Sequence, residues 1–232
     1  MTNINLIYSK LYSHFGPQYW WPTTKDDDIV PKYHKKIIHN EKQKLEICFG
    51  AILTQNTNWK NVEKAIVQLN KNQLININKI IKINNKKLAN IIRSSGYHNQ
   101  KAIKLKNFCS FLYNNYNGNI EKFFKNNIVK IRNELLSING IGPETADSII
   151  LYAAKKPVFV VDAYTKRIMN RIGFKENTYD ELQNLFMDNL KKKENLFNEY
   201  HALLVELGKN VCKTRPLCQN CPLEKSCNKN GI

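Results

Sequence analysis

Apolar and polar positions follow a helical period along most of the chain. From Leu45 onward, apolar residues recur at intervals of three and four, the spacing of one face of an α-helix. The first such face is formed by Leu45, Cys48, Phe49, Ile52 and Leu53. One short run, Pro157–Val161, has the composition of a strand, and no internal repeat is visible. We therefore expect an all-α fold.

Capping signals place the boundaries of the individual helices. Residues with side-chain oxygens start helices, proline suits a first helical turn, and glycine commonly follows a last one. Residues 1–44 give no such pattern and are expected to be irregular. Five helices are expected over Leu45–Leu53, from a cap at Thr57 or Asn58, and over Lys86–Ser95, Asn99–Tyr116 and Ile131–Ile138. Three more are expected: one that starts at Pro143, one that follows Asp162, and a last one that ends near Gly208.

A glycine-rich turn joins two of these helices. Gly140, Ile141 and Gly142 lie between the helix ending at Ile138 and the one starting at Pro143. Glycine tolerates positive φ and leaves its amide uncovered. Those amides would lie at a helix N-terminus, where partial positive charge favours a DNA phosphate. An ordinary helical hairpin with a glycine turn is the alternative.

Asp162 follows the apolar run 158–161 and precedes a helical pattern. Aspartate is a favoured N-cap, so capping alone explains its position. A second role is compatible with the cap, because a helix N-terminus also holds and orients a carboxylate.

Charge and cysteine content narrow the range of expected partners and cofactors. Lys and Arg outnumber Asp and Glu by 36 to 19, a net charge of +17, which suits a polyanionic partner; the Lys-, Asn- and Ile-rich composition explains part of that excess. Cys48 and Cys109 lie in apolar patterns and are expected in the core. The other four form a C-x5-C-x2-C-x5-C arrangement, suited to zinc or to a [4Fe–4S] cluster: Cys212, Cys218, Cys221 and Cys227.

Taken together, the segments 135–146, 161–167 and the terminal cysteines resemble the helix–hairpin–helix DNA glycosylase superfamily that includes endonuclease III. The resemblance runs from about Trp20 to Cys227. It implies that Asp162 is catalytic, that Gln55 probes the duplex at the extruded base, and that Gly140, Ile141, Gly142 and Thr145 contact DNA. It also favours [4Fe–4S] over zinc, although the first cysteine interval is one residue shorter than in the family.

Glu144 departs from part of that family. Bifunctional members carry a lysine at this position, which attacks the sugar and forms a Schiff base. A carboxylate cannot form that imine. Glu144, together with Trp20-Trp21-Pro22 and Leu53–Thr57, resembles the third bacterial class of 3-methyladenine DNA glycosylase, which lacks the cluster cysteines. We therefore expect hydrolytic removal of an alkylated base without strand cleavage.

The resemblance also implies a base pocket. Trp20, Trp21, Trp59 and Glu144 are its expected lining, since an aromatic face attracts a flipped, cationic base. Anchoring of the N-terminal segment in the core is the alternative for the tryptophans. Two other functions stay open, an endonuclease III-like glycosylase and lyase for oxidised pyrimidines, and a non-catalytic DNA-binding protein of the same fold.

The expected architecture has two helical subdomains with a cleft between them. A helical barrel with the hairpin covers 41–156; the second subdomain comprises 1–40 and 157–232, with the cluster loop at 208–232. The expected partner is double-stranded DNA carrying a damaged base. No apolar run is long enough for a membrane span, and the N-terminus has no secretory pattern. We expect a cytoplasmic monomer that associates with the nucleoid when bound to DNA.

Overall fold

The computed structural model describes residues 3–25, 28–35 and 39–232. Throughout these ranges the secondary structure is helical, apart from one isolated antiparallel bridge between Thr23 and Lys32. The all-α prediction is confirmed. The strand-like run 157–161 is extended but pairs with no strand in the described ranges, and its residues from Val158 to Val161 are buried. No helix there is long and apolar enough to cross a membrane.

The chain divides into two compact units. The terminal unit comprises Met1–Trp20 and Lys156–Ile232, and the central unit comprises Trp21–Lys155. The second boundary lies one residue from the one expected at 156. The first differs: residues 21–40 were expected with the C-terminal part, whereas the structure assigns them to the central unit.

A buried polar cluster explains that assignment. The Glu46 carboxylate accepts hydrogen bonds from the Thr24 backbone amide at 2.8 Å and from Asn70 Nδ2 at 2.9 Å. Gln43 Nε2 donates to the Thr24 carbonyl at 3.1 Å. These groups are almost fully buried, so the bonds satisfy polar atoms that would otherwise be costly to bury. The segment following Trp21 is thereby fixed to α2 (Glu41–Leu53) and α3 (Trp59–Lys71).

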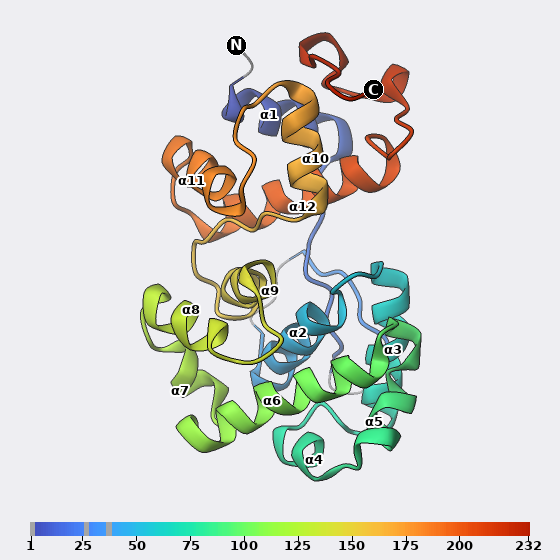
Figure 1. Ribbon diagram of the computed structural model, residues 1–232, viewed down its shortest axis with the longest axis vertical. Coiled ribbons are helices and arrows are strands. Elements are labelled where there is room, and N and C mark those ends of the chain that lie inside the picture. The colour runs from blue at the N-terminus through green and yellow to red at the C-terminus, as the bar shows by residue number, and fades with distance from the viewer. Residues whose placement is uncertain (1–2, 26–27, 36–38) are drawn as a thin grey trace. The chain divides into compact units, whose positions relative to one another are not determined.

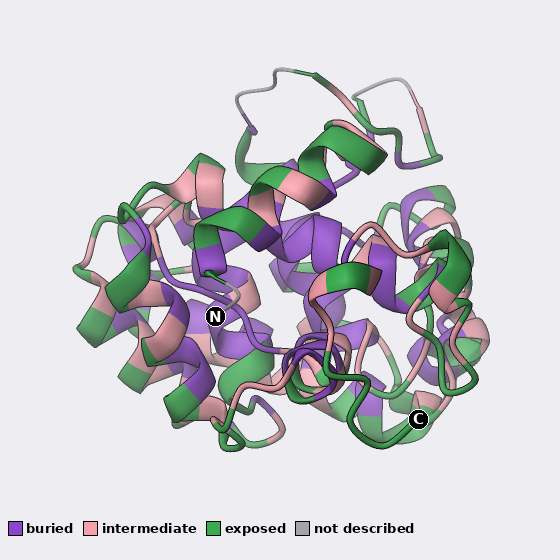
Figure 2. Cartoon of the chain, turned by 90° about the horizontal axis from the view of Figure 1, so that it is seen from above, coloured by how far each residue is buried: buried purple, intermediate pink, exposed green. Residues whose placement is uncertain are grey.

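The central unit is built around α2 (Figure 1), whose residues from Leu45 to Leu53 are all buried; Figure 2 colours the described residues by burial. Helix α6 contacts α2, α4, α5, α7 and the turn η1. The α8–α9 pair forms the hairpin. The helices of the central unit are α2 (Glu41–Leu53), α3 (Trp59–Lys71), α4 (Ile77–Lys82), α5 (Asn85–Ile91), η1 (Arg93–Ser95), α6 (His98–Tyr116), α7 (Ile120–Phe124), α8 (Ile128–Leu136), α9 (Pro143–Ser148) and the π-helical η2 (Ile149–Ala153).

The terminal unit packs α1 and α10 against α12. A stacked aromatic pair, Phe159 and Phe186 at 3.9 Å between ring centroids, lies in its core with Tyr200 edge-on to both. Its elements are α1 (Ile4–Phe15), α10 (Ala163–Ile172), α11 (Tyr179–Asn189), α12 (Glu194–Asn210), η3 (Cys218–Asn220) and η4 (Glu224–Ser226).

Most predicted helices are present, with the expected caps. Asn58 caps α3, Pro143 opens α9, and Gly96 ends η1 with a φ of +68°. The expectation that residues 1–44 are irregular is wrong for α1. Asn3 caps this helix, and Ile4, Ile7 and Leu11 form its buried face. Helices α4, α7 and α11 were also unforeseen. Of these, α4 and α7 are short, and tertiary packing supplies most of the stability of such helices.

Candidate functional site

The hairpin of the central unit has the glycine-dependent geometry that its sequence predicts. Gly140 has a φ of +95°, a left-handed conformation that side chains other than glycine adopt with strain. Ile141 donates its amide to the Ile138 carbonyl at 3.0 Å and is buried. Gly142 is the exposed N-cap of α9, with open space around its α-carbon. The turn therefore offers main chain, rather than large side chains, at its surface.

An ion pair whose carboxylate is buried joins the two hairpin helices. Asp147 of α9 is fully buried and accepts from Arg132 of α8, at 2.8 Å from Nε and 3.2 Å from Nη2. Such a two-point pair fixes the relative orientation of its elements. Nothing in the local sequence identified it, because either residue alone reads as a solvated charge.

Gln55 is bound to the hairpin. Its Nε2 donates to the Gly140 carbonyl at 3.0 Å and to Thr145 Oγ1 at 2.9 Å, and its Oε1 accepts from Lys104 Nζ at 2.5 Å. Thr145 is buried and faces inward. Two residues expected at the DNA, Gln55 and Thr145, are thus in contact with each other. Lys104 also contacts Gln55, and the sequence pattern did not identify it.

The structure separates the expected base-pocket residues by environment. Trp21 is only 8% exposed; its ring lies edge-on to Trp59 at 5.4 Å and tilted to Tyr152 at 5.2 Å. Gly50 makes room for it, since a Cβ there would lie 2.9 Å from the indole. Trp59 is half-buried. Trp21 and Trp59 therefore form one aromatic cluster in which Trp21 is the core member.

The other two expected pocket residues are Trp20 and Glu144. Trp20 is half-buried and belongs to the terminal unit. Glu144 is exposed in the first turn of α9, where an acid is favourable.

Asp162 is the N-cap of α10, as its position predicted. Its Oδ1 accepts from the Thr165 amide at 2.7 Å and from Thr165 Oγ1 at 2.8 Å. Its Oδ2 lies 3.8 Å from Nε2 of His201 on α12. The cap thus uses one carboxylate oxygen and leaves the other directed at an imidazole.

His201 is buried, and that burial lowers its pKa below the usual value, while the nearby Asp162 carboxylate opposes the shift. A neutral imidazole brings no positive charge to the Asp162 carboxylate. The sequence pattern did not draw attention to His201, which reads as one polar position on an otherwise apolar helix face.

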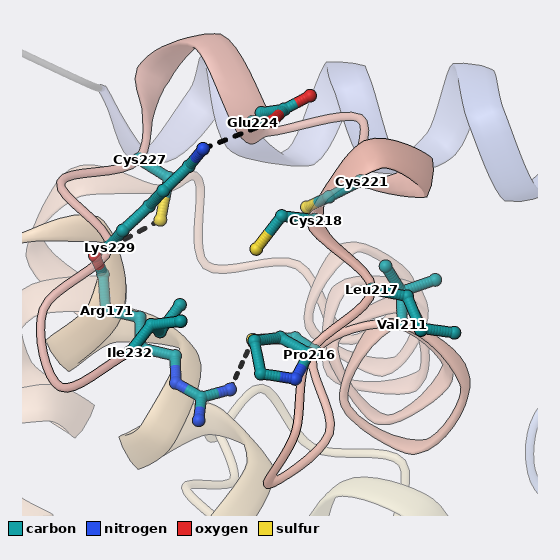
Figure 3. Close-up of a pocket in the computed structure, with 11 residues that line it drawn as sticks. Arg171, Val211, Pro216, Leu217, Cys218, Cys221, Glu224, Cys227, Lys229 and Ile232 are labelled. Carbon is teal, nitrogen blue, oxygen red and sulfur yellow. Dashed lines mark hydrogen bonds and ion pairs between the residues drawn. The ribbon is translucent and has the colours of Figure 1, made fainter.

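The four C-terminal cysteines line one pocket of the terminal unit (Figure 3). Arg171 lies beside it: Nη1 donates to Cys212 Sγ at 3.4 Å, and the Cys227 thiol donates to the Arg171 carbonyl at 3.2 Å. Arg167 holds the Cys212 carbonyl at 2.8 Å through Nη2. Both arginines lie on α10, so the helix that Asp162 caps also anchors the cysteine loop.

The four thiols that line this pocket are a donor set that suits either zinc or a [4Fe–4S] cluster. All four cysteines are free and partly exposed. In contrast, Cys48 and Cys109 are buried, as expected for the core.

The chain shares sequence with base excision repair proteins. Residues 49–192 match the family described as HhH-GPD superfamily base excision DNA repair protein. A protein of Methanocaldococcus jannaschii with the provisional name DNA repair glycosylase is 43% identical over 225 residues, 95% of this chain and 94% of that protein. Endonuclease III of Thermotoga maritima is 29% identical over 204 residues, 86% of this chain and 89% of that one.

Solved structures with this fold include a 3-methyladenine DNA glycosylase and an endonuclease III. The 3-methyladenine DNA glycosylase of H. pylori bound to 1,N6-ethenoadenine matches with a TM-score of 0.69 at 28% identity, covering 88% of this chain and 96% of that one. A non-covalent endonuclease III–DNA complex matches with a TM-score of 0.75 at 22% identity, covering 97% and 94%.

Proposed function

The chain belongs to the HhH-GPD superfamily of base excision DNA repair proteins and is a DNA glycosylase, and from that premise we propose that it removes alkylated bases such as 3-methyladenine by hydrolysis, without cutting the strand. The observation that carries this proposal is Glu144. It stands in the first turn of α9, where a Schiff-base lysine would be required for the lyase reaction.

Lysines near the hairpin do not replace the missing nucleophile. Lys101 is buried, with Nζ donating to the carbonyls of Leu53 at 2.8 Å and Ser95 at 2.6 Å. Lys104 is bound to Gln55. An amine in either position would have to break these bonds before attacking a sugar.

We assign the chemical step to Asp162. When the glycosidic C–N bond breaks, its electron pair leaves with the base, and a cationic alkylated base departs neutral. The carboxylate stabilises the positive charge left on the sugar, on the same logic as in glycoside hydrolysis. A water molecule then bonds to the sugar carbon and gives a proton to Asp162. Because burial lowers the pKa of His201, its imidazole does not compete as a cation for that carboxylate near pH 7.

The aromatic cluster is proposed to hold the flipped base. Trp59 is the partly exposed member, and Trp21 with Tyr152 supports it from the core. A cationic base over an indole face gains roughly 0.5–2 kcal/mol, which favours alkylated over normal bases. Glu144 is proposed to add negative charge to this lining, and a role of Trp20, which belongs to the terminal unit, stays a prediction. Excision of alkylated bases unchanged in Trp59→Ala and Trp20→Ala proteins would exclude this assignment.

The four cysteines are proposed to hold a [4Fe–4S] cluster that cross-links the loop 208–232 and has no part in base removal. Lys213, Arg215 and Lys225 of that loop would then face phosphates. Anaerobically purified protein should show a broad absorption band at about 400 nm. A colourless protein containing one zinc per chain would exclude the cluster.

Incubation with defined oligonucleotides tests the reaction. Duplexes carrying 3-methyladenine, thymine glycol, uracil or an abasic site separate the three candidate functions. Release of free 3-methyladenine with an intact strand supports the proposal. Strand nicking, or a covalent complex trapped by borohydride, would instead indicate the endonuclease III-like function. Neither activity, with duplex binding retained, would indicate a non-catalytic DNA-binding protein.

A matched variant controls the trapping experiment. Glu144→Lys restores the lysine at the family position and should yield a trapped complex if the assay conditions suit this protein. We also propose that the enzyme acts as a monomer on duplex DNA. Light scattering of the protein–DNA complex should then show one chain per duplex.

A further inference from the structure

Three polar side chains on one face of α6 hold the two loops proposed to contact DNA. Lys101, Lys104 and Asn107 follow each other at three-residue spacing, so they share a side of the helix. Lys101 binds the C-terminal carbonyl of α2 at Leu53, immediately before the loop 54–58. Asn107 Nδ2 donates to the Asn139 carbonyl at 3.1 Å, at the start of the hairpin turn.

Lys104 lies between these two anchors and contacts both loops. Its ammonium donates to Gln55, and its aliphatic stem covers Gly140, where a Cβ would lie 2.5 Å from Lys104 Cγ. Gln55 in turn donates to the hairpin at Gly140 and Thr145. Helix, loop and hairpin are therefore joined in a closed ring of contacts.

The ring fixes which way the Gln55 amide faces. An ammonium group is a donor only, so Lys104 requires the oxygen of the amide on its side. The nitrogen must then face the Gly140 carbonyl and the Thr145 hydroxyl, which both accept. Ordering a free glutamine side chain costs conformational entropy, and the ring meets this cost before DNA binds.

We propose that Lys104 is a positioning residue, which holds Gln55 and the Gly140 turn as one preformed element for engaging a damaged duplex. This inference rests on the proposed function and on the role that the family resemblance implies for Gln55, which is to probe the duplex at the extruded base. Lys104 acts through Gln55, and not by pairing with a phosphate. Lys101 and Asn107 fix the ends of the same two loops.

The test is a double-mutant cycle between Lys104→Met and Gln55→Ala. Methionine keeps an unbranched stem over Gly140 and removes only the ammonium. Affinity is measured for a duplex containing a stable abasic-site analogue, with 2-aminopurine opposite the lesion to report insertion. We expect Lys104→Met to weaken binding about tenfold and to reduce the fluorescence change, whereas in the Gln55→Ala background it should have no further effect.

Salt dependence separates positioning from phosphate contact. Losing one phosphate contact lowers the slope of log affinity against log salt by about 1. Lys104→Met should leave this slope unchanged. Lys87→Met, which removes an exposed lysine of the same unit, is the matched control for net charge and should leave both affinity and fluorescence near wild type.

Additive effects of the two substitutions, or a slope changed by about 1, would overturn the inference and make Lys104 a phosphate contact. Wild-type affinity in Lys104→Met protein would overturn it as well. Failure of the proposed function looks different, because the wild-type chain itself would then neither prefer the lesion duplex nor release a base. Thermal unfolding of each variant shows that it is folded.

Discussion

Asp162 Oδ2 lies 3.8 Å from His201 Nε2, while Asp162 Oδ1 is taken up by the N-cap of α10. One carboxylate thus has a structural oxygen and a second oxygen that is available for chemistry. The pair also brings together two helices of the terminal unit, α10 and α12. This division of labour makes the two roles of Asp162 separable by mutation.

Asp162→Asn should stop base release while leaving the protein folded. The asparagine oxygen still accepts from Thr165, so the cap is retained, but the negative charge is lost. Removing a group that stabilises developing charge commonly costs a hundredfold or more in rate. Single-turnover excision measures the rate, and thermal unfolding measures the cap. Asp162→Ala, the companion variant, should lose activity and also about 1 kcal/mol of stability. A fully active Asp162→Asn enzyme would restrict Asp162 to capping.

The Asp162–His201 contact predicts that the pKa of His201 depends on the charge of Asp162. The Asp162 charge raises the pKa of His201 and so opposes the lowering caused by burial. Replacing Asp162 by Asn removes that charge, and the pKa of His201 should therefore fall further. The imidazole proton signals of His201, followed by NMR from pH 7 downward in both proteins, measure the change. An unchanged or increased pKa in the variant would mean that the two groups do not interact.

His39 should make the fold sensitive to acid. Burial, with the positive charges of Lys155 and Lys44, lowers its pKa from 6.5 to about 4. Below pH 6.5 the unfolded chain therefore binds a proton that the folded chain does not, so the free energy of unfolding decreases as the pH falls from 6.5 to 4. The full effect is of the order of 3 kcal/mol. Denaturant unfolding across this range should show a shallower dependence in His39→Gln. An equally steep dependence in the variant would assign the acid sensitivity to other groups.

The crossing of α10 and α12 depends on Gly208. A Cβ at this position would lie 2.5 Å from Tyr164 Cδ1 and 2.7 Å from Tyr164 Cβ, too close for ordinary contact. Gly208→Ala should therefore destabilise the terminal unit by about 1–3 kcal/mol, the usual cost of overpacking. Gly142→Ala is the comparison, since Gly142 has open space around it and an ordinary φ of −98°. Equal midpoints for the two variants in chemical denaturation would contradict this packing.

Local sequence determined a large part of this protein. The spacing of apolar residues predicted α2, α3 and α6, and short capping signals predicted Asn58, Pro143 and Asp162 at helix ends. The glycines of the hairpin and the four clustered cysteines were visible for the same reason. Each of these features depends on residues close together in the chain, whose backbone preferences act within a few positions.

Tertiary structure decided the partners of those residues. Gln55 meets Lys104 and Gly140 across sequence separations of 49 and 85 residues, and no local pattern encodes such contacts. The same holds for Asp162 with His201 and for Arg132 with Asp147. Trp21 was expected in a pocket lining, but packing against Gly50, Trp59 and Tyr152 places it in the core. Burial and pairing of polar groups depend on which helices pack together. The sequence therefore identified the candidate chemistry, while the packed helices determine which atoms are available to perform it.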